Sequence, residues 1–165
     1  MATLQDGFYN IRYVPADSQP AAVDGMYAIG TNLGDAVKVE KPSSDRPGPQ
    51  TWRIKSIDND NYIITKEEEK EFNVLWGLQT LHYTLPSTAA ENAILLKDPG
   101  GKFALEPKNG VVTEDAVYSM RVRSDPGIEP NGDFFVTVTD QTVMAQESLI
   151  QDIPYIWKFE FVRPI

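Results

Sequence analysis

The sequence has no cysteine and a single histidine, His82. Without cysteine there is no disulfide framework, no thiolate nucleophile and none of the recognised zinc ligand sets. His82 lies in an irregular stretch with no catalytic motif around it, and no glycine-rich phosphate-binding motif occurs. Among the 24 acidic residues, no spacing marks a pair suited to glycoside chemistry. We therefore expect no enzyme, no metal site and no cofactor.

Basic residues and long apolar runs are also scarce. The 24 Asp and Glu residues outnumber the 15 Lys and Arg residues, which gives a net charge of −9. This charge repels phosphate backbones and anionic lipids, so we expect neither nucleic acid nor a membrane as partner. No apolar run approaches the ~20 residues of a membrane span, the first residues do not resemble a secretion signal, and no Asn-x-Ser/Thr acceptor occurs. These features predict a soluble, cytoplasmic monomer.

The chain does contain twelve short runs rich in Val, Ile, Tyr, Phe and Thr, separated by clusters of Gly, Pro, Asn and Asp. This pattern is typical of an all-β fold, and no amphipathic helix pattern accompanies it. The length suits a single domain, residues 1–165. We predict strands at 8–14, 26–31, 36–41, 51–57, 61–65, 72–77, 93–97, 102–107, 117–123, 133–139, 142–146 and 155–162.

Certain residues recur at a nearly constant interval when the twelve strands are read as three sets of four. Tyr9, Tyr62 and Tyr118, in the first strands, are separated by 53 and 56 residues. The aromatic residues of the fourth strands, Trp52, Phe103 and Trp157, are separated by 51 and 54. Val37, Ile94 and Val143, in the third strands, agree more loosely, at 57 and 49. The period predicts threefold internal repetition.

A period near 54 residues in an all-β chain suits a β-trefoil, a six-stranded barrel closed by three hairpins. We therefore predict a β-trefoil of twelve strands in three pseudo-repeats. Because inward-facing residues alternate along a strand, the core candidates are the alternating apolar residues of the predicted barrel strands. These are Trp52, Ile54, Tyr62, Ile64, Phe103, Leu105, Trp157 and Phe159.

The connections at 15–25 and 42–50 contain five of the twelve prolines. Proline fixes φ and reduces the entropy of a free loop, so these connections can be long, exposed and still ordered. We expect them to bind a partner. Two other polar segments have simpler interpretations: the run 58–61 is a hairpin turn rather than a calcium loop, and the acidic run 67–71 is a solvated loop.

The residues of the first half resemble a known family. Asp6-Gly7-Phe8-Tyr9 opens the chain, Asp24-Gly25-Met26-Tyr27-Ala28 lies on the second strand, and Trp52 begins the fourth. Together with Asn61-Tyr62-Ile63-Ile64-Thr65, these residues resemble the macrocypin and clitocypin inhibitors of mushrooms, the mycocypin family. The resemblance covers residues 6–65 best and becomes a match of strand order toward the C-terminus.

The resemblance implies a fungal β-trefoil that blocks papain-like cysteine proteases by occlusion with two neighbouring loops, without a covalent step. These loops join strands one to two and three to four, and correspond to the two proline-rich connections. The implied protease-binding residues are Ala21, Ala22, Val23, Asp24, Gly25 and Met26 in the first loop and Ser44, Asp45, Arg46, Pro47 and Gly48 in the second. The resemblance also implies legumain binding through an asparagine between strands five and six, for which Asn73 is the candidate.

Three alternatives remain open at this stage. Asn73 also fits an outward polar residue of an ordinary strand. Related trefoils inhibit serine proteases with a substrate-like loop residue; Arg46 precedes a proline, which leaves Asn32 and Lys70 as candidates. Finally, Gln50-Thr51-Trp52 matches the Gln-x-Trp signature of sugar-binding trefoils, although the equivalent positions read Gly101-Lys102-Phe103 and Tyr155-Ile156-Trp157.

Overall fold

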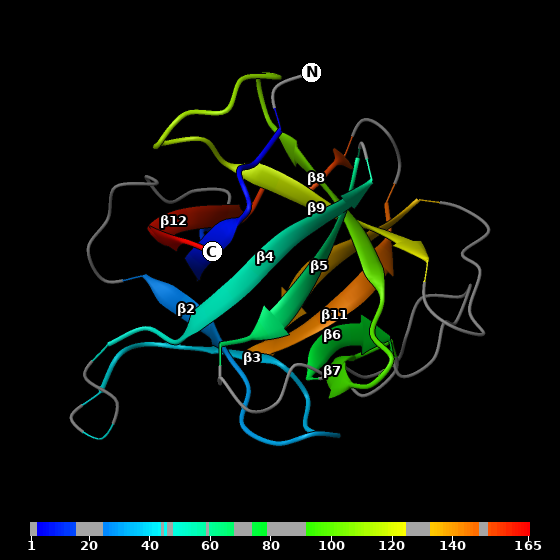
Figure 1. Ribbon diagram of the computed structural model, residues 1–165. Coiled ribbons are helices and arrows are strands. Elements are labelled where there is room, and N and C mark those ends of the chain that lie inside the picture. Colours follow the sequence, from blue (N-terminus) through cyan, green and yellow to red (C-terminus); the bar gives the residue numbers. More distant parts are fainter. Residues whose placement is uncertain are drawn as a thin grey trace.

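The computed structural model describes residues 3–15, 25–43, 45, 48–58, 60–67, 74–78, 92–124, 133–148 and 152–165. Within these ranges the chain forms twelve β-strands in one sheet and no α-helix (Figure 1). The strands are β1 (Gly7–Tyr13), β2 (Met26–Ile29), β3 (Lys38–Glu40), β4 (Thr51–Asp58), β5 (Asn61–Lys66), β6 (Leu75–Leu78), β7 (Ile94–Lys97), β8 (Lys102–Pro107), β9 (Tyr118–Ser124), β10 (Phe134–Thr139), β11 (Thr142–Glu147) and β12 (Trp157–Pro164). The prediction of an all-β fold with twelve strands is confirmed.

Six of the strands pair in a closed ring. β1 pairs with β4, β4 with β5, β5 with β8, β8 with β9, β9 with β12, and β12 returns to β1, all antiparallel. The other six strands form three hairpins, β2–β3, β6–β7 and β10–β11. Each hairpin is joined to the ring by its first strand, through the pairs β1–β2, β5–β6 and β9–β10.

The three hairpins also contact one another at Val37, Ile94 and Val143, the residues that recur in the third strands. Val37 N–H donates to Ile94 O at 2.8 Å, and Val143 N–H donates to Val37 O at 2.9 Å. All three side chains are buried. Residues separated by about fifty positions in the sequence therefore share backbone hydrogen bonds at one point of the fold.

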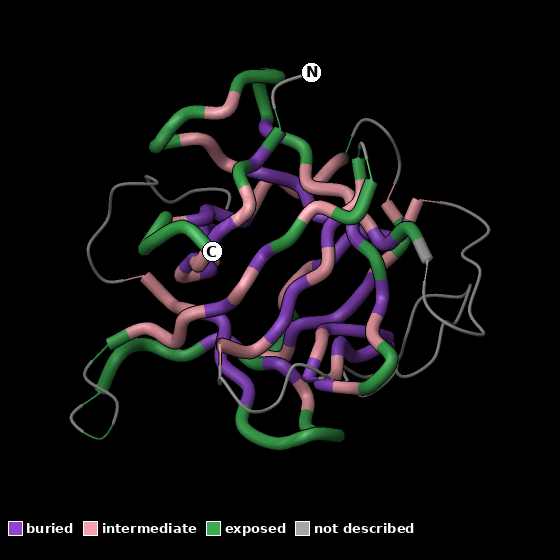
Figure 2. The backbone as a smooth tube through the Cα atoms, in the orientation of Figure 1, coloured by how far each residue is buried: buried purple, intermediate pink, exposed green. Residues whose placement is uncertain are grey.

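The core fills the space inside the strands, and buried segments follow the strand centres while exposed segments form the connections (Figure 2). Of the eight predicted core residues, seven are buried, and Leu105 is partly buried against the same cluster. Trp76 of β6, which we did not single out, is fully buried. Its ring lies 5.3 Å from Trp52, 6.5 Å from Phe103 and 6.4 Å from Trp157, centroid to centroid, in edge-on contacts.

The position of Trp76 explains why the second set of strands departs from the aromatic pattern. The strand pairings place Ala28, Trp76 and Val136 at corresponding positions of β2, β6 and β10. Where that residue is small, the fourth strand supplies a tryptophan, Trp52 or Trp157; where it is Trp76, the fourth strand supplies the smaller Phe103. The exchange keeps the core filled, which close packing requires.

The predicted start of β6 was three residues too early. The sequence pattern placed that strand at 72–77, whereas β6 covers Leu75–Leu78. Val74 precedes it and accepts a hydrogen bond from Lys66 N–H at 2.9 Å, which closes the base of the β5–β6 connection. An apolar run therefore marked the strand but not the residue at which pairing begins. In the described ranges, no helix has the length and apolarity needed to cross a membrane.

Candidate functional site

The bases of the two proline-rich connections lie next to each other. In the β2–β3 hairpin, Tyr27 pairs with Glu40, so Gly25 and Met26 at the end of the first connection adjoin Lys41 at the start of the second. The proximity follows from the antiparallel register, in which the beginning of one strand faces the end of its neighbour. The register therefore brings the described ends of the two connections side by side.

Gly25 lies against the side chain of Arg12. A Cβ atom at position 25 would come within 2.8 Å of Cζ and 2.9 Å of Cδ of Arg12, and closer still to Nε. Arg12 is only 5% exposed, so it cannot move aside freely. Met26 pairs with Tyr13 and packs partly buried against the core. The two described residues at the end of the first connection therefore both have packing roles in the fold.

A polar contact supports the same region from the β12 side. Burial, together with the hydrogen bond that Tyr27 makes to Glu160, raises the pKa of Tyr27 to about 12, against the opposing effect of the nearby Arg12 charge. Tyr27 therefore stays protonated and continues to donate to Glu160 at neutral pH. We did not foresee Arg12 or Glu160, because neither belongs to a local motif and only pairing brings them beside β2.

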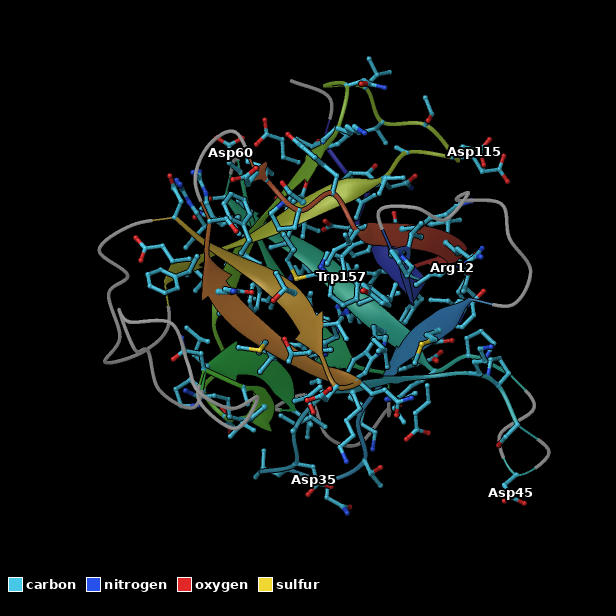
Figure 3. The ribbon with its side chains drawn as sticks, turned by 180° about the vertical axis from the view of Figure 1, so that it is seen from behind. Arg12, Asp35, Asp45, Asp60, Asp115 and Trp157 are labelled. Atoms are coloured by element: carbon cyan, nitrogen blue, oxygen red, sulfur yellow. The ribbon has the colours of Figure 1, made fainter. Side chains whose placement is uncertain are left out.

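The second connection is exposed along its described part. Lys41, Pro42, Ser43, Asp45 and Gly48 are all exposed. Figure 3 shows Asp45 at the far end of a loop that projects from the body of the molecule. Around Gly48 there is open space, because no atom lies within 4 Å of a Cβ added there. This loop can therefore contact a partner without any rearrangement of the core.

Gln50 fixes the end of that loop to β2. Its Oε1 accepts a hydrogen bond from Gly30 N–H at 3.0 Å, and its Nε2 donates to Gly30 O at 3.1 Å. Two residues on, Trp52 is fully buried and its Nε1–H donates to Ala28 O at 3.0 Å. Both members of the Gln-x-Trp match thus make contacts within the fold, with Gln50 partly buried and Trp52 fully buried.

Only part of the predicted site can be placed. Gly25, Met26, Asp45 and Gly48 are described, as above. The other predicted protease-binding residues lie outside the described residues: Ala21, Ala22, Val23, Asp24, Ser44, Arg46, Pro47 and Asn73. Lys70 and His82 also lie outside them.

Asn32, the described candidate for a serine protease contact, lies in a closed turn. Asp35 N–H donates to Asn32 O at 3.0 Å, and Asn32 N–H donates to Asp35 Oδ2 at 3.1 Å. A substrate-like inhibitor must present the carbonyl of its reactive residue to the oxyanion hole of the protease. The Asn32 carbonyl is already engaged, and this geometry disfavours that role.

The remaining polar motifs have structural partners where they are described. Asp58 ends β4 and Asn61 begins β5, and Asn61 Nδ2–H donates to Asp58 Oδ1 at 2.6 Å. Glu67 of the acidic run pairs with Arg163. Among the residues that the structure describes, no three acidic or histidine side chains gather in a way that could hold a metal ion.

Neither a protein-family model nor a curated protein matches this chain. The case for function therefore depends on the geometry of the two connections.

Proposed function

We propose that the chain is a β-trefoil. Three features support this: the closed ring of six strands, the three hairpins attached to it in the same way, and the backbone contacts that join Val37, Ile94 and Val143. The equivalent positions of Ala28, Trp76 and Val136 give a further argument from side chains. The second set has its tryptophan at this position, whereas the first and third sets have theirs in the fourth strand. A ring of this kind leaves its long connections free for binding.

On this scaffold, we propose inhibition of papain-like cysteine proteases by the β1–β2 and β3–β4 connections. The observation that carries the proposal is the pairing of Tyr27 with Glu40, which brings the bases of the two connections together. Two adjacent loops can enter a protease cleft from both sides of the catalytic cysteine. Inhibition of this kind is occlusion, so it requires no nucleophile and no cofactor from this chain.

The local chemistry suits occlusion. Pro42 and Pro49 restrict the free loop, and the Gln50 amide fixes its end to Gly30, so less entropy is lost when the loop binds. The exposed residues of the loop carry few apolar groups that would need burial in the free protein. Preorganisation thus replaces a large apolar interface as the source of affinity.

The experiment measures inhibition of papain by the wild-type chain and by loop variants. Gly48→Glu places a charged side chain in open space on the second loop, and Asp45→Lys reverses a charge at its tip. If the loop lies in the protease cleft, each change raises the inhibition constant by roughly tenfold or more, the effect of a misplaced group at an interface centre.

Asp60→Lys is the matched control. Asp60 is an exposed residue of the β4–β5 turn, and Figure 3 shows it on the opposite side of the molecule from Asp45. It undergoes the same charge reversal and leaves papain inhibition unchanged. Absence of papain inhibition by the wild-type chain, or an equal loss in Asp60→Lys, would overturn the proposal. Gly25→Glu is a poor probe, because the new side chain would collide with Arg12.

Legumain inhibition is a second candidate, and it involves a different connection. The hydrogen bond between Lys66 N–H and Val74 O closes the base of the β5–β6 loop, which contains Asn73. A loop with a closed base can present an asparagine side chain to a protease that prefers asparagine. Asn73→Ala should abolish legumain inhibition and leave papain inhibition intact; retention of legumain inhibition would exclude this residue.

A further inference from the structure

A cavity of about 610 Å³ lies between the N-terminal segment, the β8–β9 connection and β12. Its apolar lining consists of Leu4, Tyr9, Val112, Tyr118, Phe159 and Phe161. The volume is in the range of small-molecule sites in proteins. It is separate from the two proline-rich connections, since none of its lining residues belongs to residues 15–25 or 42–50.

Four aromatic rings form one side of this cavity. The ring centroids of Tyr9 and Phe161 are 5.4 Å apart, those of Tyr9 and Phe159 6.3 Å, and those of Tyr118 and Phe159 5.1 Å, all edge-on. Tyr9, Tyr118 and Phe159 are buried, whereas Phe161 is 51% exposed. A large aromatic ring that the fold leaves half in water, beside a cavity, offers apolar and π surface to a ligand.

The charged groups at the cavity are unbalanced. Lys158 lies buried in the wall, and its Nζ is 3.3 Å from Asp115 Oδ1 on the β8–β9 connection, so the charge of this cation is compensated. Figure 3 shows Asp115 on that connection, at the edge of the molecule. Glu114, an exposed residue of the β8–β9 connection, also lines the cavity and gives it a further carboxylate. Glu160 lines it as well, and its carboxylate accepts the hydrogen bond from Tyr27 of β2 described above. The local charge is therefore negative, and the net charge of −9 reinforces it.

We propose that this cavity binds a small organic cation, with its apolar body on the aromatic rings and its ammonium group directed to Glu114. Aromatic faces and carboxylates together are the usual means by which proteins hold quaternary and alkyl ammonium groups. An organic anion would be repelled by the Glu114 carboxylate. An inorganic cation would gain little from the aromatic rings, which supply no ligand atoms.

The test uses three probes that share a benzene ring: benzyltrimethylammonium, the neutral benzyl alcohol and the anionic benzoate. Isotope-labelled protein is titrated with each probe, and the dissociation constant is taken from amide shifts. We expect the cation to perturb the amides of 112–114 and 159–161 and to bind roughly tenfold more tightly than benzyl alcohol, with benzoate weakest.

Two exposed residues permit variants that leave the core intact. Glu114→Gln removes one carboxylate, and Phe161→Ala removes the exposed ring; each should weaken binding of benzyltrimethylammonium by at least about threefold. The matched controls are Glu147→Gln and Val162→Ala, two exposed positions that do not line the cavity, and these should bind as the wild type does.

Three results would overturn the proposal: cation and neutral probe binding equally, amide shifts located elsewhere, or controls that weaken binding as much as the cavity variants. All these measurements are made without a protease. Failure of the cation site would therefore leave the inhibitor proposal untouched, and the converse also holds.

Discussion

Three tyrosines at corresponding positions of β1, β5 and β9 differ in the hydrogen bonding of their hydroxyl groups. Tyr9 Oη–H donates to Gln5 O at 2.7 Å, and Tyr62 Oη–H donates to Leu4 O at 3.3 Å. The Tyr118 hydroxyl is buried and has no hydrogen-bond partner within the described part of the chain. The backbone carbonyl groups of Leu4 and Gln5 thus satisfy two of the three hydroxyl groups.

The three tyrosine-to-phenylalanine variants should therefore differ in stability. Tyr9→Phe and Tyr62→Phe each remove a hydrogen bond, and we expect each to lower the free energy of unfolding by about 1 kcal/mol. Tyr118→Phe removes a hydroxyl that is buried without a partner, so we expect a change near zero or a small gain. Urea denaturation of the three variants measures this order. A loss in Tyr118→Phe as large as in Tyr9→Phe would contradict it.

The two described glycines of the candidate loops should respond in opposite ways to alanine. Gly25→Ala forces a methyl group against the buried Arg12 side chain, and overpacking of this kind costs about 1–3 kcal/mol of unfolding free energy. Gly48→Ala places the same group in open space and should change stability by less than about 0.5 kcal/mol. Thermal unfolding of both variants checks the contrast, and equal stabilities would refute the close contact with Arg12.

At the scale of elements, Gln50 links the end of the β3–β4 connection to the end of β2. Gln50→Ala should cost about 1–3 kcal/mol, because it removes one donor and one acceptor for the Gly30 backbone. Gln50→Glu keeps the acceptor but places a carboxylate beside Gly30 O. At neutral pH we therefore expect Gln50→Glu to be no more stable than Gln50→Ala. Below the pKa of the carboxyl group introduced in this variant, the protonated carboxyl can donate to Gly30 O. Gln50→Glu should then become more stable than Gln50→Ala.

The readouts are urea denaturation from about pH 7 to about pH 4 and papain inhibition by the same variants. Gln146→Ala, a half-buried glutamine of β11, is the control and should leave inhibition unchanged. If Gln50 positions the loop, the inhibition constant rises in both variants even where the protein remains folded. An unchanged inhibition constant in folded Gln50→Ala would show that the amide bridge does not contribute to binding.

The elements were largely predictable from the sequence, and the reason is physical. Alternating apolar residues, as in Trp52 and Ile54 or Tyr62 and Ile64, have the two-residue period of a strand with one buried face. Trp76 was missed because its importance depends on Ala28 and Val136 in other strands. Of the candidate site, the two connections could be located from their prolines, whereas the packing of Gly25 on Arg12 requires the pairing of β1 with β2.

At the scale of the whole molecule, buried tyrosines make stability depend on alkaline pH. Burial is the main cause that raises the pKa of Tyr9, Tyr27 and Tyr118 from 10.0 to about 12. The folded state favours the protonated phenol, so this contribution to stability is complete below the unfolded pKa of 10.0. It is lost as the pH rises from there through about 12, because the unfolded chain releases its protons first.

We therefore expect the free energy of unfolding to be nearly constant from about pH 7 to about pH 9 and to fall steadily above about pH 10. Denaturant titrations at increasing pH measure the decline, and absorbance of the phenolate shows a group of tyrosines that ionise late. The Tyr27→Phe variant should show a smaller decline. A stability that is constant up to pH 12 would contradict the burial of these hydroxyls.

The closing pair of the ring joins the first strand to the twelfth, with Gly7 opposite Pro164. On the ribosome, β1 emerges long before β12. Pairing with β2 and β4 does not replace the pairing of β1 with β12. The barrel therefore cannot close during most of its own synthesis, and the nascent chain must keep its apolar strands from other partners until β12 leaves the exit tunnel. Apolar strand surface left exposed during translation, rather than instability of the finished protein, is the cost that this strand order imposes.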